Sequence, residues 1–224
     1  MNDYRYEIKF ILNQASYSDA MQWLYVNTNT VNKYPNRYIN SIYLDNLEYD
    51  SVKANLSGIG NREKRRIRWY DNDPSVKLET KVRNGRLSRK EMIQINLGEN
   101  FSSDLSSIEL RSNINNWLLT QSDLHFDYFA SILGVRYLRQ YYEDNSGLRI
   151  TFDHEIQFTD LHDDACSFSM SNRFVNYAPI IMEIKFDPHL KDYANSFVRR
   201  LNMTPKRHSK YLVGMAHLEN VVYI

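Results

Sequence analysis

The stretch KRRIRWYDNDPSVKLETKVRNGRLSRKEMIQI, residues 64–95, contains three successive runs in which charged and apolar side chains alternate. In the first run Lys64, Arg66 and Arg68 occupy every second position, and the apolar Ile67 lies between two of them. Side chains two residues apart point to the same face of a β-strand. The first two runs therefore predict strands with one charged face and one largely apolar face, and the third predicts a strand that has Ser88 and Lys90 on one face.

Turn residues separate the three runs. Asp71 to Pro74 is a short polar segment that joins the first run to the second, and its composition is typical of a turn. Asn84-Gly85 joins the second run to the third, and this dipeptide is a strong signal for a β-hairpin. The stretch thus predicts three consecutive antiparallel strands.

The same alternation recurs along the whole chain. We predict eight strands, at Tyr6–Phe10, Arg37–Asp45, Lys64–Tyr70, Val76–Arg83, Leu87–Ile95, Val135–Glu143, Leu148–Asp153 and Ile180–Phe186. Helical spacing of apolar residues predicts helices at Ser18–Thr28, Leu47–Leu56, Asp104–Leu119, Leu190–Met203 and near His208–Glu219. These elements indicate an α+β fold whose helices pack outside the sheet.

Length and charge narrow the functional class. The 224 residues suit one domain, residues 1–224, and the 28 basic residues nearly balance the 27 acidic ones. A general nucleic-acid or membrane binder is expected to be more uniformly basic. No stretch approaches the ~20 apolar residues of a membrane span, so we expect a soluble, cytoplasmic protein with no nucleic-acid partner and no membrane insertion. Cys166 is the one cysteine, which excludes an intrachain disulfide.

A Glu-x-Lys pattern repeats on three predicted strands, at Glu7-Lys9, Glu79-Lys81 and Glu183-Lys185. In an ordinary antiparallel sandwich such charged faces point to water, and this is one interpretation. The other is an eight-stranded antiparallel β-barrel tunnel with the charged faces inside, where one elongated ligand fits. Because buried cations need anionic partners, such a tunnel is expected to bind a chain of phosphates.

Carboxylates among these cations suit a divalent metal ion, because Mg²⁺ and Mn²⁺ prefer oxygen ligands. The metal would then link a glutamate to the phosphates. For Glu7 and Glu79, simple pairing with a neighbouring cation is an equally good interpretation.

Six short motifs occur along the chain in this order: YEIKF (6–10), RRIRWYD (65–71), LETK (78–81), LRITFD (148–153), MEIKF (182–186) and HSKY (208–211). Together they resemble the VTC domain, the catalytic domain of the vacuolar transporter chaperone polyphosphate polymerase and a branch of the triphosphate tunnel metalloenzymes. The similarity covers nearly the whole chain, and it implies the same eight-stranded tunnel.

The resemblance also implies roles for individual residues. The implied phosphate-binding residues are Lys9, Arg66, Arg68, Lys81, Lys90, Arg139, Arg149, Arg207 and Lys210. Glu183 is implied as the ligand of Mn²⁺ or Mg²⁺. The implied catalytic residues are Arg66, Arg68, Lys81, Arg139 and Glu183.

The activity implied by the resemblance is transfer of the γ-phosphate of ATP to a polyphosphate chain. In the hydrolytic relatives the first strand resembles Glu-x-Glu-x-Lys, whereas Arg5 replaces the first glutamate here, which favours the polymerase-like branch. Two alternatives stay open: a metal-dependent tri- or polyphosphatase, and a non-catalytic module that binds polyphosphate or a nucleotide. The expected partners are ATP and polyphosphate or another triphosphate, and a membrane-protein partner is left open.

Overall fold

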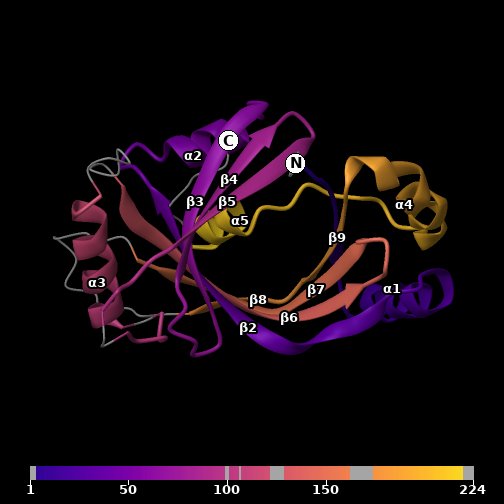
Figure 1. Ribbon diagram of the computed structural model, residues 1–224, viewed down its shortest axis with the longest axis horizontal. Coiled ribbons are helices and arrows are strands. Elements are labelled where there is room, and N and C mark those ends of the chain that lie inside the picture. The colour runs from indigo at the N-terminus through magenta and orange to yellow at the C-terminus, as the bar shows by residue number, and fades with distance from the viewer. Residues whose placement is uncertain (1–3, 99–100, 106, 122–128, 162–173, 219–224) are drawn as a thin grey trace.

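The computed structural model describes residues 4–98, 101–105, 107–121, 129–161 and 174–218 (Figure 1). Cys166 and Glu219 lie outside these ranges. The strands are β1 (Tyr6–Leu12), β2 (Val31–Asp45), β3 (Asn61–Tyr70), β4 (Lys77–Asn84), β5 (Leu87–Gln94), β6 (Ala130–Glu143), β7 (Arg149–Asp160), β8 (Val175–Tyr177) and β9 (Ile180–Phe186). The helices are α1 (Gln14–Asn27), α2 (Asp50–Leu56), α3 (Ile108–Leu119), α4 (Lys191–Val198) and α5 (Lys210–His217).

One antiparallel sheet contains all of these strands. Eight of them follow the order β1-β9-β7-β6-β2-β3-β4-β5, and they correspond to the eight predicted strands. The remaining strand, β8, pairs with β7 at Ile156 to Phe158. Its three residues are too few for alternation to reveal it. The α+β fold with a curved antiparallel sheet is therefore confirmed.

The first and last strands of this order nearly meet, but the sheet does not close into a continuous barrel. Among the described residues, Arg5 and Ser88 form the one backbone bridge between these edges, with N···O distances of 3.0 and 3.2 Å. Farther along β1, the carbonyl of Lys9 accepts a hydrogen bond from the backbone N–H of Lys206 at 2.9 Å. The segment before α5 therefore covers the part of the β1 edge beyond the bridge.

Three helices pack against the apolar outer face of the sheet. Trp23 and Leu24 of α1 and Phe197 of α4 share a core with β1, β7 and β9. Leu110 of α3 shares a second core with Ile67 and other residues of β2, β3 and β4. Alternation explains this placement, because Ile67 points away from the face that carries Arg66 and Arg68.

The last helix, α5, differs from the predicted arrangement because it lies on the inner side of the sheet, between its two walls (Figure 1). Tyr211 of α5 stacks on Tyr43 of β2, with ring centroids 4.9 Å apart and the planes 2° from parallel. At Gly214 an added Cβ would lie 2.6 Å from Leu133 Cδ2 and 2.8 Å from Phe158 Cδ1. The glycine therefore allows the helix to approach the inner wall closely.

Several element boundaries differ from the predictions: β6 begins at Ala130 rather than Val135, β7 ends at Asp160 rather than Asp153, and α1 begins at Gln14 rather than Ser18. Two further differences have identifiable reasons. Strand β2 begins at Val31 rather than Arg37, and register shifts between Asn32 and Tyr34 and between Tyr34 and Arg37 break the alternation there. The helix predicted at Leu190–Met203 is reduced to α4 and two flanking 3-10 turns. It ends at Asn202, whose φ of 50° lies in the left-handed region and does not continue a helix.

Candidate functional site

The charged faces of β3, β4 and β5 combine into one inner wall. Arg66 is the register partner of Glu79, Lys64 is that of Lys81, and Lys81 is in turn that of Lys90. Register partners in an antiparallel ladder carry their side chains on the same face. The alternation of each separate strand therefore yields a continuous charged surface facing the interior.

Glu79 is the centre of the first cluster on this wall. Its carboxylate is 1% exposed and lies 2.7 Å from Arg66 Nη2, 3.3 Å from Arg68 Nη1 and 2.9 Å from Lys90 Nζ. Burial raises the pKa of Glu79, but the three cations outweigh burial and hold the pKa far below its usual range. Glu79 is therefore an ion-pair partner of the predicted phosphate-binding residues, the simpler of its two interpretations.

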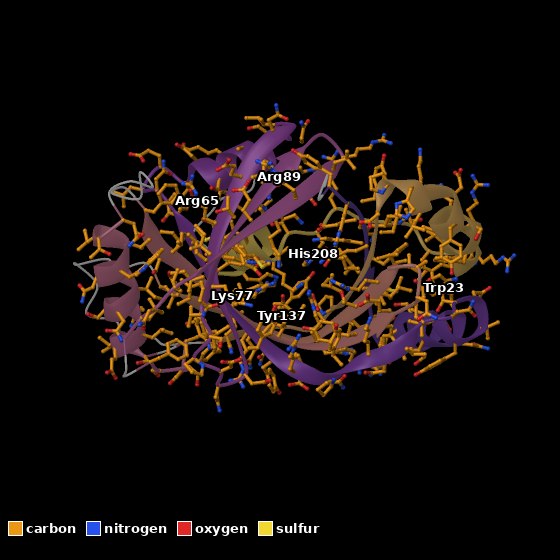
Figure 2. All side chains as sticks on the ribbon, in the orientation of Figure 1. Trp23, Arg65, Lys77, Arg89, Tyr137 and His208 are labelled. Atoms are coloured by element: carbon orange, nitrogen blue, oxygen red, sulfur yellow. The ribbon has the colours of Figure 1, made fainter. Side chains whose placement is uncertain are left out.

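Neutral groups orient the two arginines of this cluster. Arg68 Nε donates to Ser41 Oγ at 3.1 Å, and its Nη2 donates to the Tyr137 hydroxyl, also at 3.1 Å. Arg66 Nη1 donates to the Tyr43 hydroxyl at 3.2 Å. Figure 2 shows Tyr137 and His208 in the space between the two walls of the sheet. Ser41 and Tyr43 of β2 and Tyr137 of β6 therefore fix the planes of the two guanidinium groups, in addition to the carboxylate of Glu79.

Asp153 of β7 forms a second cluster. It is fully buried and accepts hydrogen bonds from Arg139 Nε at 2.6 Å, Arg139 Nη2 at 2.8 Å and Lys210 Nζ at 2.5 Å. Burial raises the pKa of Asp153, but Arg139 and Lys210 outweigh burial and lower it far below its usual range. Asp153 therefore holds Lys210, at the start of α5, in the same part of the inner wall as Arg139.

Glu183 of β9 forms the third cluster. Its carboxylate is 8% exposed and lies 3.2 Å from Lys9 Nζ, 3.0 Å from Lys185 Nζ and 3.9 Å from Arg139 Nη2. Nearby, Glu7 Oε2 lies 2.5 Å from Lys81 Nζ. Burial raises the pKa of Glu183, but Lys185, Lys9, Lys81 and Arg139 outweigh it, so the carboxylate stays ionised.

Most of the predicted site residues share these clusters, namely Lys9, Arg66, Arg68, Lys81, Lys90, Arg139, Glu183 and Lys210. Two do not. Arg149 Nη2 pairs with Glu143 at 3.3 Å, and its side chain is 37% exposed. Arg207 is exposed and has no ion pair within the described part of the chain. Both lie at the periphery of the three clusters, and their assignment stays a prediction.

Sequence reasoning assigned no site role to Asp153, Lys185, Tyr43 or Tyr137. Each shares a predicted charged face or a register row with an assigned residue. The register was needed to find them, because it places Asp153 opposite Arg139 across two neighbouring strands. A single strand's alternation contains no such information.

The donor set around Glu183 fits a divalent ion bound together with phosphate. In the described residues no group of three or more His, Cys, Asp and Glu side chains could hold a metal by itself. Burial and the charge of Glu183 raise the pKa of Glu7, but Lys81, Lys185 and Lys9, which come from three strands, outweigh both and lower it. Magnesium commonly binds through one or two carboxylates plus substrate phosphates, which is the set that Glu183 and Glu7 offer.

Comparisons with known proteins agree with this architecture. The chain is similar to the solved structure of a putative adenylyl cyclase from Hippeastrum, described as revealing a dominant triphosphatase activity, with a TM-score of 0.55 and 15% identity over 96% of this chain and 95% of that one. A solved structure of a Pyrococcus horikoshii protein has a TM-score of 0.54 and 14% identity, over 97% of this chain and 99% of that one. A putative adenylate cyclase from Vibrio parahaemolyticus has a TM-score of 0.50 and 12% identity, over 95% of this chain and 99% of that one.

At these identities the likeness concerns the fold alone. No curated protein matches the sequence, and no helix within the described residues has the length and apolar character needed to cross a membrane. The family model of the VTC domain matches residues 4–219, nearly the whole chain. The chain therefore belongs to the VTC domain family.

Proposed function

We propose that this protein is a metal-dependent phosphotransferase, which holds ATP and a phosphate chain in its tunnel and transfers the γ-phosphate of ATP to that chain. Its family and the fold it shares with the Hippeastrum protein support phosphoryl-transfer or triphosphatase chemistry in general. The transfer to a phosphate chain is the proposal.

The excess of cations over carboxylates on the inner wall, where Arg68 and Arg139 are buried and most of the others are partly buried, is the observation that supports it. In the three clusters, eight cations share only four carboxylates, although the whole chain is almost neutral. Concentrated positive charge of this kind is unfavourable without a counter-anion. An extended anion with many oxygens, such as triphosphate or polyphosphate, satisfies several cations at once through charge-assisted hydrogen bonds.

Phosphoryl transfer between phosphates needs no protein nucleophile. Its barrier falls mainly through alignment of the reacting groups and neutralisation of charge on the transferred group. Arg66, Arg68 and Arg139 are suited to this because their guanidinium groups are already held by buried carboxylates and hydroxyls. A divalent ion at Glu183 and Glu7 would neutralise phosphate charge when bound, and the arginines and lysines would position the two phosphate chains.

The first strand supports a phosphate acceptor over water. Arg5, at the position where the hydrolytic relatives are expected to have a glutamate, pairs with Asp187 at 3.2 Å, and both side chains are nearly half exposed. Strand β1 therefore offers one inward carboxylate, Glu7, and not two. Hydrolysis is the second candidate, because the structurally similar Hippeastrum protein is described as a triphosphatase.

Incubation of the purified protein with ATP and Mn²⁺ or Mg²⁺, with and without a short polyphosphate primer, tests the proposal. We expect chains that lengthen as ADP accumulates. Release of inorganic phosphate with no chain growth would favour the hydrolytic alternative. If the protein binds triphosphate tightly but consumes no ATP, it is a binding module.

A further inference from the structure

Lys64 is a lysine of the inner wall that the site described above does not use. It lies in β3 between Arg62 and Arg66, on the face that carries Arg66 and Arg68, and its side chain is partly buried. Its Nζ donates a hydrogen bond to the hydroxyl of Ser209, 2.8 Å away, which lies just before α5. Lys64 therefore joins the wall of β3 to the segment that leads into α5.

Lys64 differs from the neighbouring cations in its partners. Lys9 lies 3.2 Å from Glu183, Lys81 lies 2.5 Å from Glu7, and the guanidinium of Arg66 lies 2.7 Å from Glu79. Lys64 has no carboxylate within ion-pair distance among the described residues. Its one polar partner in the part of the chain that the structure describes, the hydroxyl of Ser209, is neutral.

The charged groups with the largest effect on Lys64 are positive. They are Lys9 of β1, Lys81 of β4, and Arg62 and Arg66 of β3 itself. The nearby carboxylates Glu7, Glu79 and Glu183 are each occupied by other cations. Burial first, and then these four cations, lower the pKa of Lys64 well below its usual range.

We propose that Lys64 is a further phosphate-binding residue of the tunnel, and that it takes up a proton from solvent as the phosphate chain enters. The inference rests on the proposed function, because it assumes that the tunnel binds a phosphate chain. A neutral amine donates weakly to an anionic oxygen, whereas an ammonium group has three donors and a full charge. Phosphate oxygens placed among Lys9, Lys64 and Lys81 supply the negative charge that this part of the wall lacks.

Calorimetric titration with triphosphate, without metal, in two buffers of equal pH but different heats of ionisation, counts the protons taken up on binding. The ligand, with its own protonation equilibrium, and all other titrating groups of the protein are the same in each variant. A difference in the number of protons taken up therefore reports on Lys64. We expect Lys64→Met to take up fewer protons than the wild type, by up to one, and to bind about tenfold more weakly, as for loss of a charge-assisted contact. Lys53→Met, which removes an exposed lysine of α2, should match the wild type.

The variant Lys64→Arg distinguishes the effect of a positive charge at this position from the effect of proton uptake. Arginine stays protonated at all relevant pH values, so this variant should keep most of the affinity and still lose the proton uptake. If Lys64 served only to hold Ser209, Lys64→Met would weaken binding without changing the proton count, and that result overturns the inference. An unchanged affinity and proton count in Lys64→Met overturns it too. Wild-type protein that does not bind triphosphate would instead overturn the proposed function itself.

Discussion

Asp153 accepts two hydrogen bonds from the guanidinium of Arg139, at 2.6 Å from Nε and 2.8 Å from Nη2, and neither side chain is more than 10% exposed. The two residues are register partners on β6 and β7. Lys210 completes the set from the start of α5. A single carboxylate thus fixes one catalytic candidate and one binding candidate from different elements.

Asp153→Asn should destabilise the protein strongly. Removing one partner of a buried ion pair leaves uncompensated charge, a change that lowers the free energy of unfolding by about 3–5 kcal/mol. Chemical denaturation followed by circular dichroism measures the change. Asp192→Asn, at an exposed position of α4, is the matched control and should stay within about 0.5 kcal/mol of the wild type. Equal stability of the two variants would show that Arg139 and Lys210 do not depend on this carboxylate.

Glu183→Gln should abolish turnover of ATP while triphosphate binding in the absence of metal is retained or strengthened. The substitution preserves the shape of the side chain and removes the charge that a divalent ion needs, whereas Lys9 and Lys185 remain available to phosphate. ATP consumption with Mn²⁺, calorimetry and a melting curve together check this. Glu91→Gln, at a side chain that is 55% exposed on β5, controls for the loss of a charge. Full metal-dependent activity in Glu183→Gln would exclude the assignment.

Arg66→Ala should weaken the binding of triphosphate about tenfold or more, because a charge-assisted contact with phosphate contributes about 1.5–3 kcal/mol. Its side chain is 20% exposed and so remains accessible to a ligand while Glu79 holds it. Arg89→Ala on β5 removes an arginine that is 45% exposed and pairs with Glu91. Calorimetry should show unchanged affinity in this control. The same affinity in Arg66→Ala would place the charged face outside the binding site.

His208 should make the stability depend on pH. Its side chain is 9% exposed, and both ring nitrogens lack a hydrogen-bond partner among the described residues. Burial, followed by the charges of Lys210 and Lys9, lowers the pKa of His208 to about 3. Because the unfolded chain has the higher pKa, it binds more protons between the two values, and stability falls as the pH falls below about 6.5.

By pH 5 this single group should lower the free energy of unfolding by roughly 2 kcal/mol. His208→Phe keeps a ring beside Tyr177, which lies 5.6 Å away between centroids, and removes the titration. Denaturation midpoints of this variant should change less between pH 7 and pH 5 than those of the wild type. His189→Gln, at an exposed position, should follow the wild-type curve. Parallel curves for His208→Phe and wild type would contradict the prediction.

Alternation of side chains was sufficient to locate all eight strands of the main path, because most of them have chemically distinct faces. It was insufficient where the backbone departs from regular pairing, as in the first residues of β2 with their register shifts. It also could not place α5, since the helical spacing of Tyr211 and Met215 shows an apolar face but not which side of the sheet that face contacts. Long-range packing decides that.

The candidate site was predictable for residues whose charge repeats along one strand, such as Arg66 and Arg68. Residues whose role depends on a neighbouring strand were missed, and Asp153 is the clearest example. Alternation places Lys64 on the same face as Arg66 and Arg68, as the structure does. Its lack of a carboxylate partner, however, depends on the positions of Glu7, Glu79 and Glu183 in three other strands. Only the folded arrangement shows that difference.

The incomplete junction between β1 and β5 affects how the tunnel moves. Within the described residues, one backbone bridge at Arg5 and Ser88 joins these edges, and Glu7 reinforces it through Lys81 and, at 3.4 Å, Ser88 Oγ. Breaking two backbone hydrogen bonds and a partly exposed ion pair requires much less free energy than separating two strands with a full ladder. The amide hydrogens at this junction should thus exchange with solvent through local opening, faster than those of β2 and β6, and more so at high ionic strength, which weakens the ion pair.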